Sequence, residues 1–235
     1  MRIAMWSGPR NLSTTMMYAF ASRSDFAAWD EPFYAPYLAG SGEEHPMLDT
    51  ILARHESDPR TVAEMCLGPI PGARDHFYMK HMPHHMLDDF PLEWAKACVN
   101  VHLIRHPKRV IASYAQKRNT PTVADLGFHQ QLAIFQELGG IVVDSEDIRQ
   151  DPETALSILC EKIDLPFDGS MLTWEAGPKA FDGAWAPHWY NAIHSSTGFA
   201  GPEGPMPDVE SRFEHILEDV MPSYQTLFDE KTDLR

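Results

Sequence analysis

Short apolar runs alternate with longer stretches of helical spacing along most of the chain. The runs stop at glycine or at charged residues, as buried strands commonly do, and they cover residues 2–7, 26–29, 77–79, 98–104 and 141–143. Between them, apolar residues recur at helical spacing over 13–21, 45–67 with a break near Pro59, 107–114, 126–138 and from 151 onward. Alternating strands and helices indicate an α/β fold, with a central, mainly parallel sheet flanked by helices on both faces.

The last third of the chain has a different composition. Residues 177–207 are rich in glycine, proline and aromatic side chains, which predicts an irregular, lid-like segment. A helix over 209–230 is expected to follow it. No linker-like stretch separates two units, so the sequence predicts a single domain over 1–235 with its core in 1–170. Five aromatic residues of the segment could cover an apolar acceptor or pack the segment onto the sheet: Phe181, Trp185, Trp189, Tyr190 and Phe199.

Composition narrows the class of partner. The chain has 235 residues, 43% of them hydrophobic, and a net charge of −15. A chain this acidic is a poor candidate for binding nucleic acid or an anionic membrane surface, but a local positive pocket could still hold a small anion. Three cysteines without CxxC spacing are expected to be buried, reduced thiols. With neither a signal-peptide pattern nor a membrane span in the sequence, we expect a cytoplasmic protein.

Polar residues able to handle an anion gather where the expected strands end. In an open α/β sheet, ligands bind beyond the carboxyl ends of the strands. The five ends carry residues 7–15, then Asp30 and Glu31, then Lys80 and His81, then Arg105 and His106, and finally Asp144. The sequence therefore predicts an anion site at this edge of the sheet.

The turn after the first strand, residues 8–15, is the strongest local feature. Backbone N–H groups at the start of the following helix face an open site and carry the positive end of the helix dipole. Arg10 adds planar donors matched to phosphate, and Ser13, Thr14 and Thr15 add hydroxyls, one of which could cap the helix. The turn is not a Walker A loop, because the second glycine and the lysine are missing. An ordinary capped helix with a chance arginine is the alternative.

Three further groups suggest roles in a reaction. Arg105 leaves the fourth strand, and Ser113 follows eight residues later, so the two could clamp one phosphate. His81 at a strand end could serve as a general base, with Glu31 as a second candidate base or a purely structural carboxylate. His81 and His85 have the spacing of helical zinc ligands, but Pro83 between them argues against a helix, so no metal site is predicted.

Taken together, these residues resemble the sulfotransferases that use 3′-phosphoadenosine 5′-phosphosulfate. Residues 9–14, PRNLST, are similar to that family's PKSGTT or PRSGTT loop. Residues 80–83, KHMP, are similar to its KTHLP segment, and Arg105, Pro107 and Ser113 resemble its second donor motif. Residues 143–147 with Asp151 and Pro152 resemble its later YEDL…DP segment. The four matches lie in the family's order.

The resemblance implies a three-layer P-loop-type fold and a set of roles for matching residues. Arg105 and Ser113 would hold the donor's 3′-phosphate, and Lys179 is the nearest candidate for a late RKG segment that also contacts it. His81 would take the proton of a hydroxyl or amine acceptor, a small molecule, and no metal would take part. The donor's 5′-phosphosulfate would be held by Arg10, Asn11, Leu12, Ser13, Thr14 and Thr15.

Two departures from the family pattern keep other functions open. Leu12 replaces the loop glycine, and Lys80 falls where the family has threonine. A P-loop kinase or nucleotide hydrolase is one alternative, with residues 141–144 as a Walker B-like strand whose Asp144 would bind magnesium. A catalytically degenerate protein that binds a phosphorylated ligand is the other. The acceptor and the oligomeric state cannot be derived from this sequence.

Overall fold

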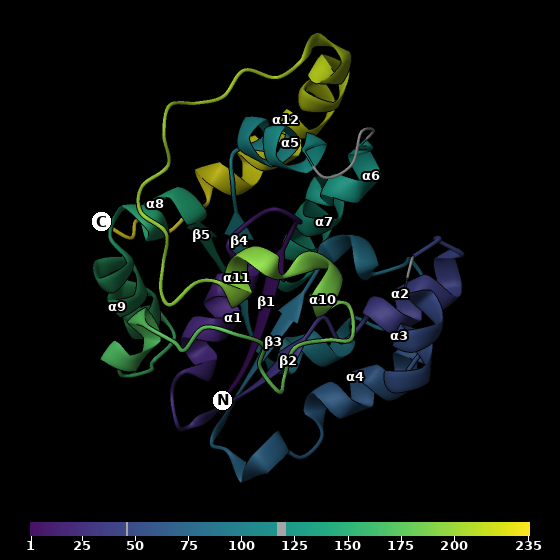
Figure 1. Cartoon of the computed structure of the whole chain (residues 1–235), viewed down its shortest axis with the longest axis vertical. Coiled ribbons are helices and arrows are strands. Elements are labelled where there is room, and N and C mark those ends of the chain that lie inside the picture. Colours follow the sequence, from purple (N-terminus) through teal and green to yellow (C-terminus); the bar gives the residue numbers. More distant parts are fainter. Residues whose placement is uncertain (46, 117–120) are drawn as a thin grey trace.

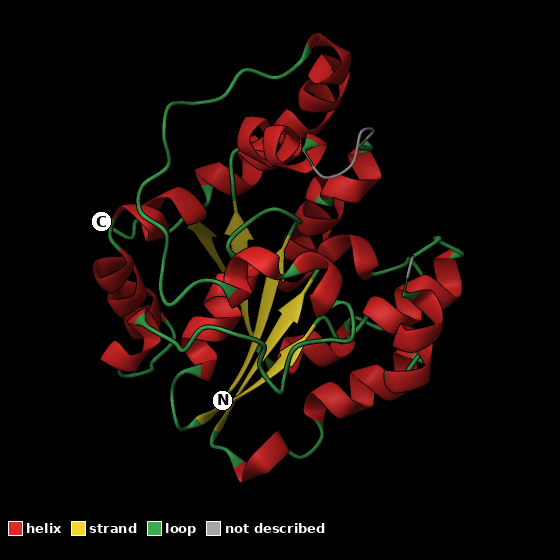
Figure 2. Ribbon diagram, viewed as in Figure 1, coloured by secondary structure: helices red, strands yellow, loops and turns green. Residues whose placement is uncertain are grey.

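Five parallel strands form the centre of the computed structural model, which describes residues 1–45, 47–116 and 121–235. The strands are β1 (Arg2–Ser7), β2 (Phe26–Asp30), β3 (His76–His81), β4 (Val99–Ile104) and β5 (Ile141–Asp144). Their order across the sheet is β2-β3-β1-β4-β5, and all four neighbouring pairs are parallel (Figure 2). This arrangement confirms the predicted α/β fold and places β1 in the middle of the sheet.

Helices cover both faces of the sheet (Figure 1). Side chains of successive strand residues point to opposite faces, and β1 follows this rule: Ile3 and Met5 join one buried cluster, Ala4 and Trp6 another. The first cluster contains α1 (Ser13–Ala21) and α9 (Pro152–Lys162). On the opposite face lie α4 (Pro59–Leu67), α7 (Phe128–Leu138) and α12 (Glu214–Asp229).

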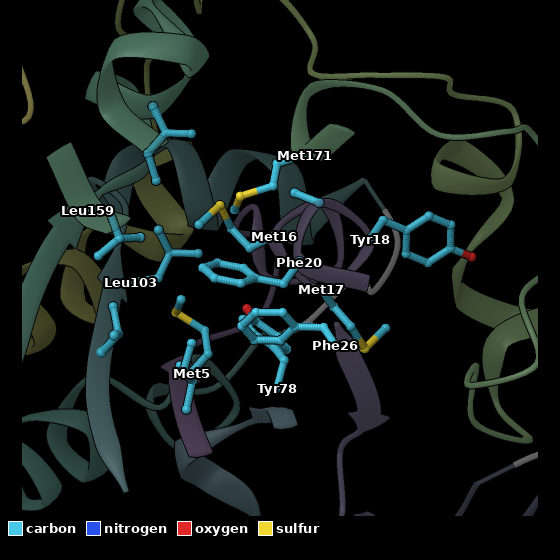
Figure 3. Close-up of a cluster of buried hydrophobic side chains, with 14 of the residues drawn as sticks. Met5, Met16, Met17, Tyr18, Phe20, Phe26, Tyr78, Leu103, Leu159 and Met171 are labelled. Carbon is cyan, nitrogen blue, oxygen red and sulfur yellow. The ribbon is translucent and has the colours of Figure 1, made fainter. Parts of the chain in front are cut away.

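The packing of α1 on the sheet fixes the position of the turn that precedes it. Met16 and Phe20 of α1 are fully buried, and the Phe20 ring stacks on Tyr78 of β3 with ring centroids 4.9 Å apart (Figure 3). Burying one such side chain contributes roughly 1.5–3 kcal/mol. The start of α1 is thereby held against the carboxyl ends of β1 and β3.

The remaining helices mostly follow the sequence pattern. Asp58 caps α4, and Pro59 is its first residue, as the expected break implies. The expected helix over 126–138 is divided at Gly127, which has a φ of 70°. The helices not yet described are α2 (Tyr34–Ser41), α3 (Leu48–Arg54), α5 (Pro107–Ala115), α6 (Val123–Leu126), α8 (Ser145–Gln150), α10 (Ala186–Trp189) and α11 (Asn191–His194), with 3-10 turns η1 (Pro71–Ala73), η2 (Pro83–His85), η3 (Glu93–Ala97), η4 (Gly169–Leu172) and η5 (Ser211–Phe213).

Two expectations need correction. The segment 177–207 is not irregular throughout, because α10 and α11 form within it. The closing helix begins at Glu214 rather than near 209, and η5 precedes it. Among the described residues, no helix has both the length and the apolar character that crossing a membrane requires.

Candidate active site

A cavity of about 410 Å³ lies at the carboxyl ends of the strands. Most of the residues predicted for the site line it, and they follow three different strands, β1, β2 and β4. His81 and Lys179 do not line it. The cavity is lined by chain segments as distant in the sequence as Pro9 and Glu203. The predicted residues that do line it are Arg10, Asn11, Leu12, Ser13, Thr14, Thr15, Glu31, Arg105 and Ser113.

The turn after β1 has a tightly constrained backbone. A Cβ atom on Gly8 would lie 2.7 Å from the Leu126 carbonyl oxygen, so only glycine allows this close approach. Arg10 adopts a φ of 57°, in the left-handed region that few residues other than glycine occupy. Strained residues of this kind cluster at binding and catalytic sites. The strain at Arg10 therefore supports a functional role for the turn.

The start of α1 is left open toward the cavity. The predicted hydroxyl cap is absent: Leu12 precedes the helix and Ser13 is its first residue, with no side-chain cap. Asn11 instead fixes the turn, since its Nδ2 donates to the Leu103 carbonyl (3.0 Å) and its Oδ1 accepts from the Leu12 N–H (2.8 Å). The N–H groups of the first helical turn are thus available for an anion.

The two predicted donor motifs are in direct contact. Arg10 Nε donates to Ser113 Oγ at 3.0 Å, and Arg105 Nη1 donates to the Arg10 carbonyl oxygen. Burial lowers the pKa of both guanidinium groups, and in Arg10 the charge of Arg105 lowers it further. Two half-buried cations side by side are stabilised by a bound anion. This part of the cavity is therefore suited to phosphate or sulfate.

One carboxylate lies against this positive region. Glu203 Oε1 is 2.5 Å from Arg105 Nη2 and 2.7 Å from Arg149 Nη1, and Glu203 Oε2 is 2.7 Å from Arg109 Nε. The Glu203 side chain is only 3% exposed. Sequence reasoning missed Arg149 and Glu203, which lie on α8 and on the segment after α11, because no local pattern marks an ion pair between residues 54 positions apart.

His81 does not occupy the position that its expected role requires. The register pairs Trp6 with His81 and Met5 with Lys80, so His81 lies on the face of the sheet opposite to α1. Its ring is 1% exposed and stacks on Trp6, with centroids 4.7 Å apart. Burial lowers the pKa of His81 to about 3, which keeps the ring neutral. The structure thus does not support His81 as the general base.

Lys80, not His81, faces the cavity. Its ammonium group is buried and donates to Asp30 Oδ1 (3.0 Å), Glu31 Oε1 (2.5 Å) and Tyr190 Oη (2.6 Å). Burial alone would lower the pKa of Lys80, but the charges of Asp30 and Glu31 outweigh it, so the pKa lies above its ordinary value. Lys80 is therefore a fixed positive charge between two buried carboxylates.

Glu31 is the acidic group most suited to accept a proton in the cavity. Its backbone has a φ of 43°, the second strained position at a strand end. Burial raises the pKa of Glu31, which Lys80 opposes. While Oε1 is held by Lys80, Oε2 lies 3.8 Å from His85 Nδ1. Glu31 lines the cavity, and a carboxylate there with one oxygen fixed can act as a base.

Aromatic rings form the wall next to Glu31. Tyr34, Tyr37 and Trp189 line the cavity there, and the His85 ring stacks on Tyr34 with centroids 4.4 Å apart. Of the five aromatic residues singled out in 177–207, Trp185 is fully buried and packs against Tyr34, as the packing alternative expected. Trp189 and Tyr190 contribute to the cavity. An apolar wall beside a base is suited to an organic acceptor.

Two other sequence-based assignments are not supported by the geometry. Lys179 lies away from the donor turn, in a second hollow with Tyr18 and Trp174, and its Nζ donates to the Glu175 carbonyl at 2.7 Å. Asp144 is 4% exposed, lies outside the cavity and caps α8 by accepting from the Glu146 N–H at 2.9 Å. Neither side chain reaches the positive region around Arg10. Over the described residues, no three His, Cys, Asp or Glu side chains are arranged to hold a metal ion.

The chain matches one family model over almost its whole length. The sequence model of the sulfotransferase domain matches residues 1–230. Two Arabidopsis thaliana proteins, branched-chain-amino-acid aminotransferase-like proteins 1 and 2, are each 35% identical over 231 residues, or 96% of this chain. The chain spans only 41% of the length of each of them.

Two solved structures that align with this chain are reported for comparison. A sulfotransferase domain from the curacin biosynthetic pathway aligns with a TM-score of 0.49 and 15% identity, over 93% of this chain and 96% of its own. A mouse sulfotransferase complexed with PAP aligns with a TM-score of 0.47 and 13% identity, over 72% of this chain and 61% of its own. Since the family match covers almost the whole sequence, this chain belongs to the sulfotransferase family.

Proposed function

We propose that the protein transfers the sulfuryl group of 3′-phosphoadenosine 5′-phosphosulfate to a hydroxyl or amine of a small-molecule acceptor, with Glu31 as the general base. One observation carries the proposal: the open start of α1, Arg10, Arg105 and Ser113 line the same cavity as Glu31. Candidate groups for two phosphates and a candidate base thus face one cavity of about 410 Å³. That combination fits a transfer between an anionic donor and an organic acceptor.

The proposed reaction assigns each group a step. The acceptor oxygen or nitrogen attacks sulfur, and the bond between sulfur and the 5′-phosphate oxygen breaks. The leaving bisphosphate keeps the electron pair, and its growing charge is stabilised by Arg10 and the N–H groups at the start of α1. Glu31 Oε2 accepts the acceptor's proton. Lys80 holds Glu31 Oε1 and thereby orients the carboxylate.

A nucleotide titration tests the donor site directly. We expect adenosine 3′,5′-bisphosphate to bind in calorimetry without magnesium, and Arg105→Ala to weaken that binding about 10- to 100-fold, since hydrogen bonds to charged groups contribute about 1.5–3 kcal/mol. Arg60→Ala, at an exposed position of α4, is the matched control. Binding of ATP with magnesium in place of the bisphosphate would favour the kinase alternative. Failure of both nucleotides to bind would favour a degenerate site.

A His81 variant distinguishes the two candidate bases, Glu31 and His81. We expect His81→Phe to keep its transfer rate within about tenfold of the wild-type rate, because His81 lies among Trp6, Trp94 and Phe33 and outside the cavity. The assay is transfer of radiolabelled sulfuryl groups to a panel of alcohols and amines, with a thermal melt to confirm folding. A folded variant slower by 10²-fold or more would return His81 to the role of base.

A further inference from the structure

The segment that carries Glu203 is attached to the protein mainly through arginine side chains. It runs as a long coil without helix or strand from α11 past α8 toward η5 (Figure 1). Gly201, Pro202, Gly204 and Pro205 are exposed, yet the Glu203 side chain between them is buried. Arg149 donates twice to the Gly201 carbonyl, and Arg109 donates to the Gly204 carbonyl at 2.8 Å. The buried carboxylate is thus the centre of the attachment.

Glu203 neutralises only part of the charge around it. Three guanidinium groups, those of Arg105, Arg109 and Arg149, meet one carboxylate. Glu203 Oε1 accepts hydrogen bonds from Arg105 and Arg149, whereas Oε2 forms only an ion pair with Arg109. Among the described residues, Glu203 Oε2 and the Nε atoms of Arg105 and Arg109 are buried without a hydrogen-bond partner. A phosphate dianion offers more oxygens and twice the charge to the same three groups. On electrostatic grounds, this site is better matched to phosphate than to the carboxylate it holds.

We propose that Glu203 is an internal competitor for the donor's second phosphate, and that the segment bearing it is displaced when the donor binds. The inference rests on the proposed function, because Arg105 is the residue assigned there to the 3′-phosphate. Glu203 lines the same cavity as Arg10 and Arg105, so it lies in the path of a ligand that fills this end. It lowers the affinity for donor and product alike, and its return to the three arginines helps to expel the product bisphosphate.

Removing the Glu203 charge tests the proposal. We expect Glu203→Gln to bind adenosine 3′,5′-bisphosphate about tenfold more tightly than wild type, while the affinity for adenosine 5′-monophosphate, which has no second phosphate, stays unchanged. Glu210→Gln is the matched control, since Glu210 lies on the same chain segment and pairs with the exposed side chain of Arg212. Bisphosphate binding that is equal or weaker in Glu203→Gln would overturn the proposal, because a structural carboxylate gives that result.

A second measurement keeps the test independent of the nucleotide. We expect inorganic phosphate to raise the melting temperature of Glu203→Gln more than that of wild type, because the three arginines are then free to bind it. If neither nucleotide binds any variant, the proposed donor is wrong, and the phosphate result alone decides the role of Glu203. In that case, an equal rise in the melting temperatures of both proteins would overturn the proposal that Glu203 competes with phosphate.

Discussion

Replacing Glu31 with glutamine is expected to slow sulfuryl transfer about 10²- to 10⁴-fold, the usual contribution of a general base. The amide keeps the shape of the side chain and a hydrogen-bond acceptor toward Lys80, but it cannot accept the proton of the acceptor. Binding of adenosine 3′,5′-bisphosphate should be unchanged, because Arg10, Arg105 and Ser113 are untouched. The comparison needs an acceptor from the radiolabel screen, saturating donor and the Glu64→Gln variant as an exposed control.

The pH profile adds an independent test of this role. Burial raises the pKa of Glu31, and a base must be ionised to act, so the rate should rise with pH through a value above that of an ordinary carboxyl group. Glu31→Gln should lose this limb of the profile. If Glu31→Gln stays folded and keeps the wild-type rate, Glu31 is not the base and its role is purely structural.

Replacing Lys80 with methionine is expected to destabilise the protein by about 3–5 kcal/mol at pH 7, because it leaves the buried carboxylates of Asp30 and Glu31 without their cation. For a chain of this size, that corresponds to a melting temperature lower by roughly 6–20 °C. Urea unfolding at several pH values measures the loss. Lys96→Met is the matched control: Lys96 is more than half exposed and 3.8 Å from Glu137, so about 0–1 kcal/mol is expected.

The loss in Lys80→Met should depend on pH in a defined direction. Lys80 lowers the pKa of Glu31, so its removal raises that pKa further above the value in the unfolded chain. A raised carboxyl pKa means that folding becomes less favourable as pH rises through it. The difference from wild type should therefore shrink toward acidic pH, where Glu31 is protonated. A difference that is constant from pH 5 to pH 8 would contradict this assignment of charges.

The features that the sequence predicted well are those set by local patterns. Apolar runs that stop at polar residues located every strand, because a strand buried on both faces must be apolar along its length. Since all five strands are parallel, their carboxyl ends had to lie at one edge, and Arg10, Glu31 and Arg105 had to lie near each other. The turn after β1, residues 8–15, could be predicted to lie at the same edge for the same reason.

The features that it missed depend on packing between distant segments. Lys80 and His81 are neighbours in a strand and must point to opposite faces, but which face borders the cavity depends on where α1 packs. The resemblance favoured His81, and the structure places Lys80 there. Glu203 meets Arg105 across 98 positions of sequence, and no periodicity marks such a pair. The glycine- and proline-rich composition of residues 177–207 also gave no indication of the two short helices α10 and α11.

The position of β1 at the centre of the sheet divides the proposed site into two halves. The groups proposed for the donor follow β1 and β4, whereas Glu31 and Lys80 come from β2 and β3 on the other side. The aromatic wall next to Glu31 is formed by Tyr34 and Tyr37 of α2, which follows β2, and by Trp189 of α10. The chain segments proposed to contact the acceptor are thus separate from those proposed to bind the donor. Under the proposed function, changes in loops on one side of the sheet would therefore alter acceptor choice and leave the groups proposed for the donor intact.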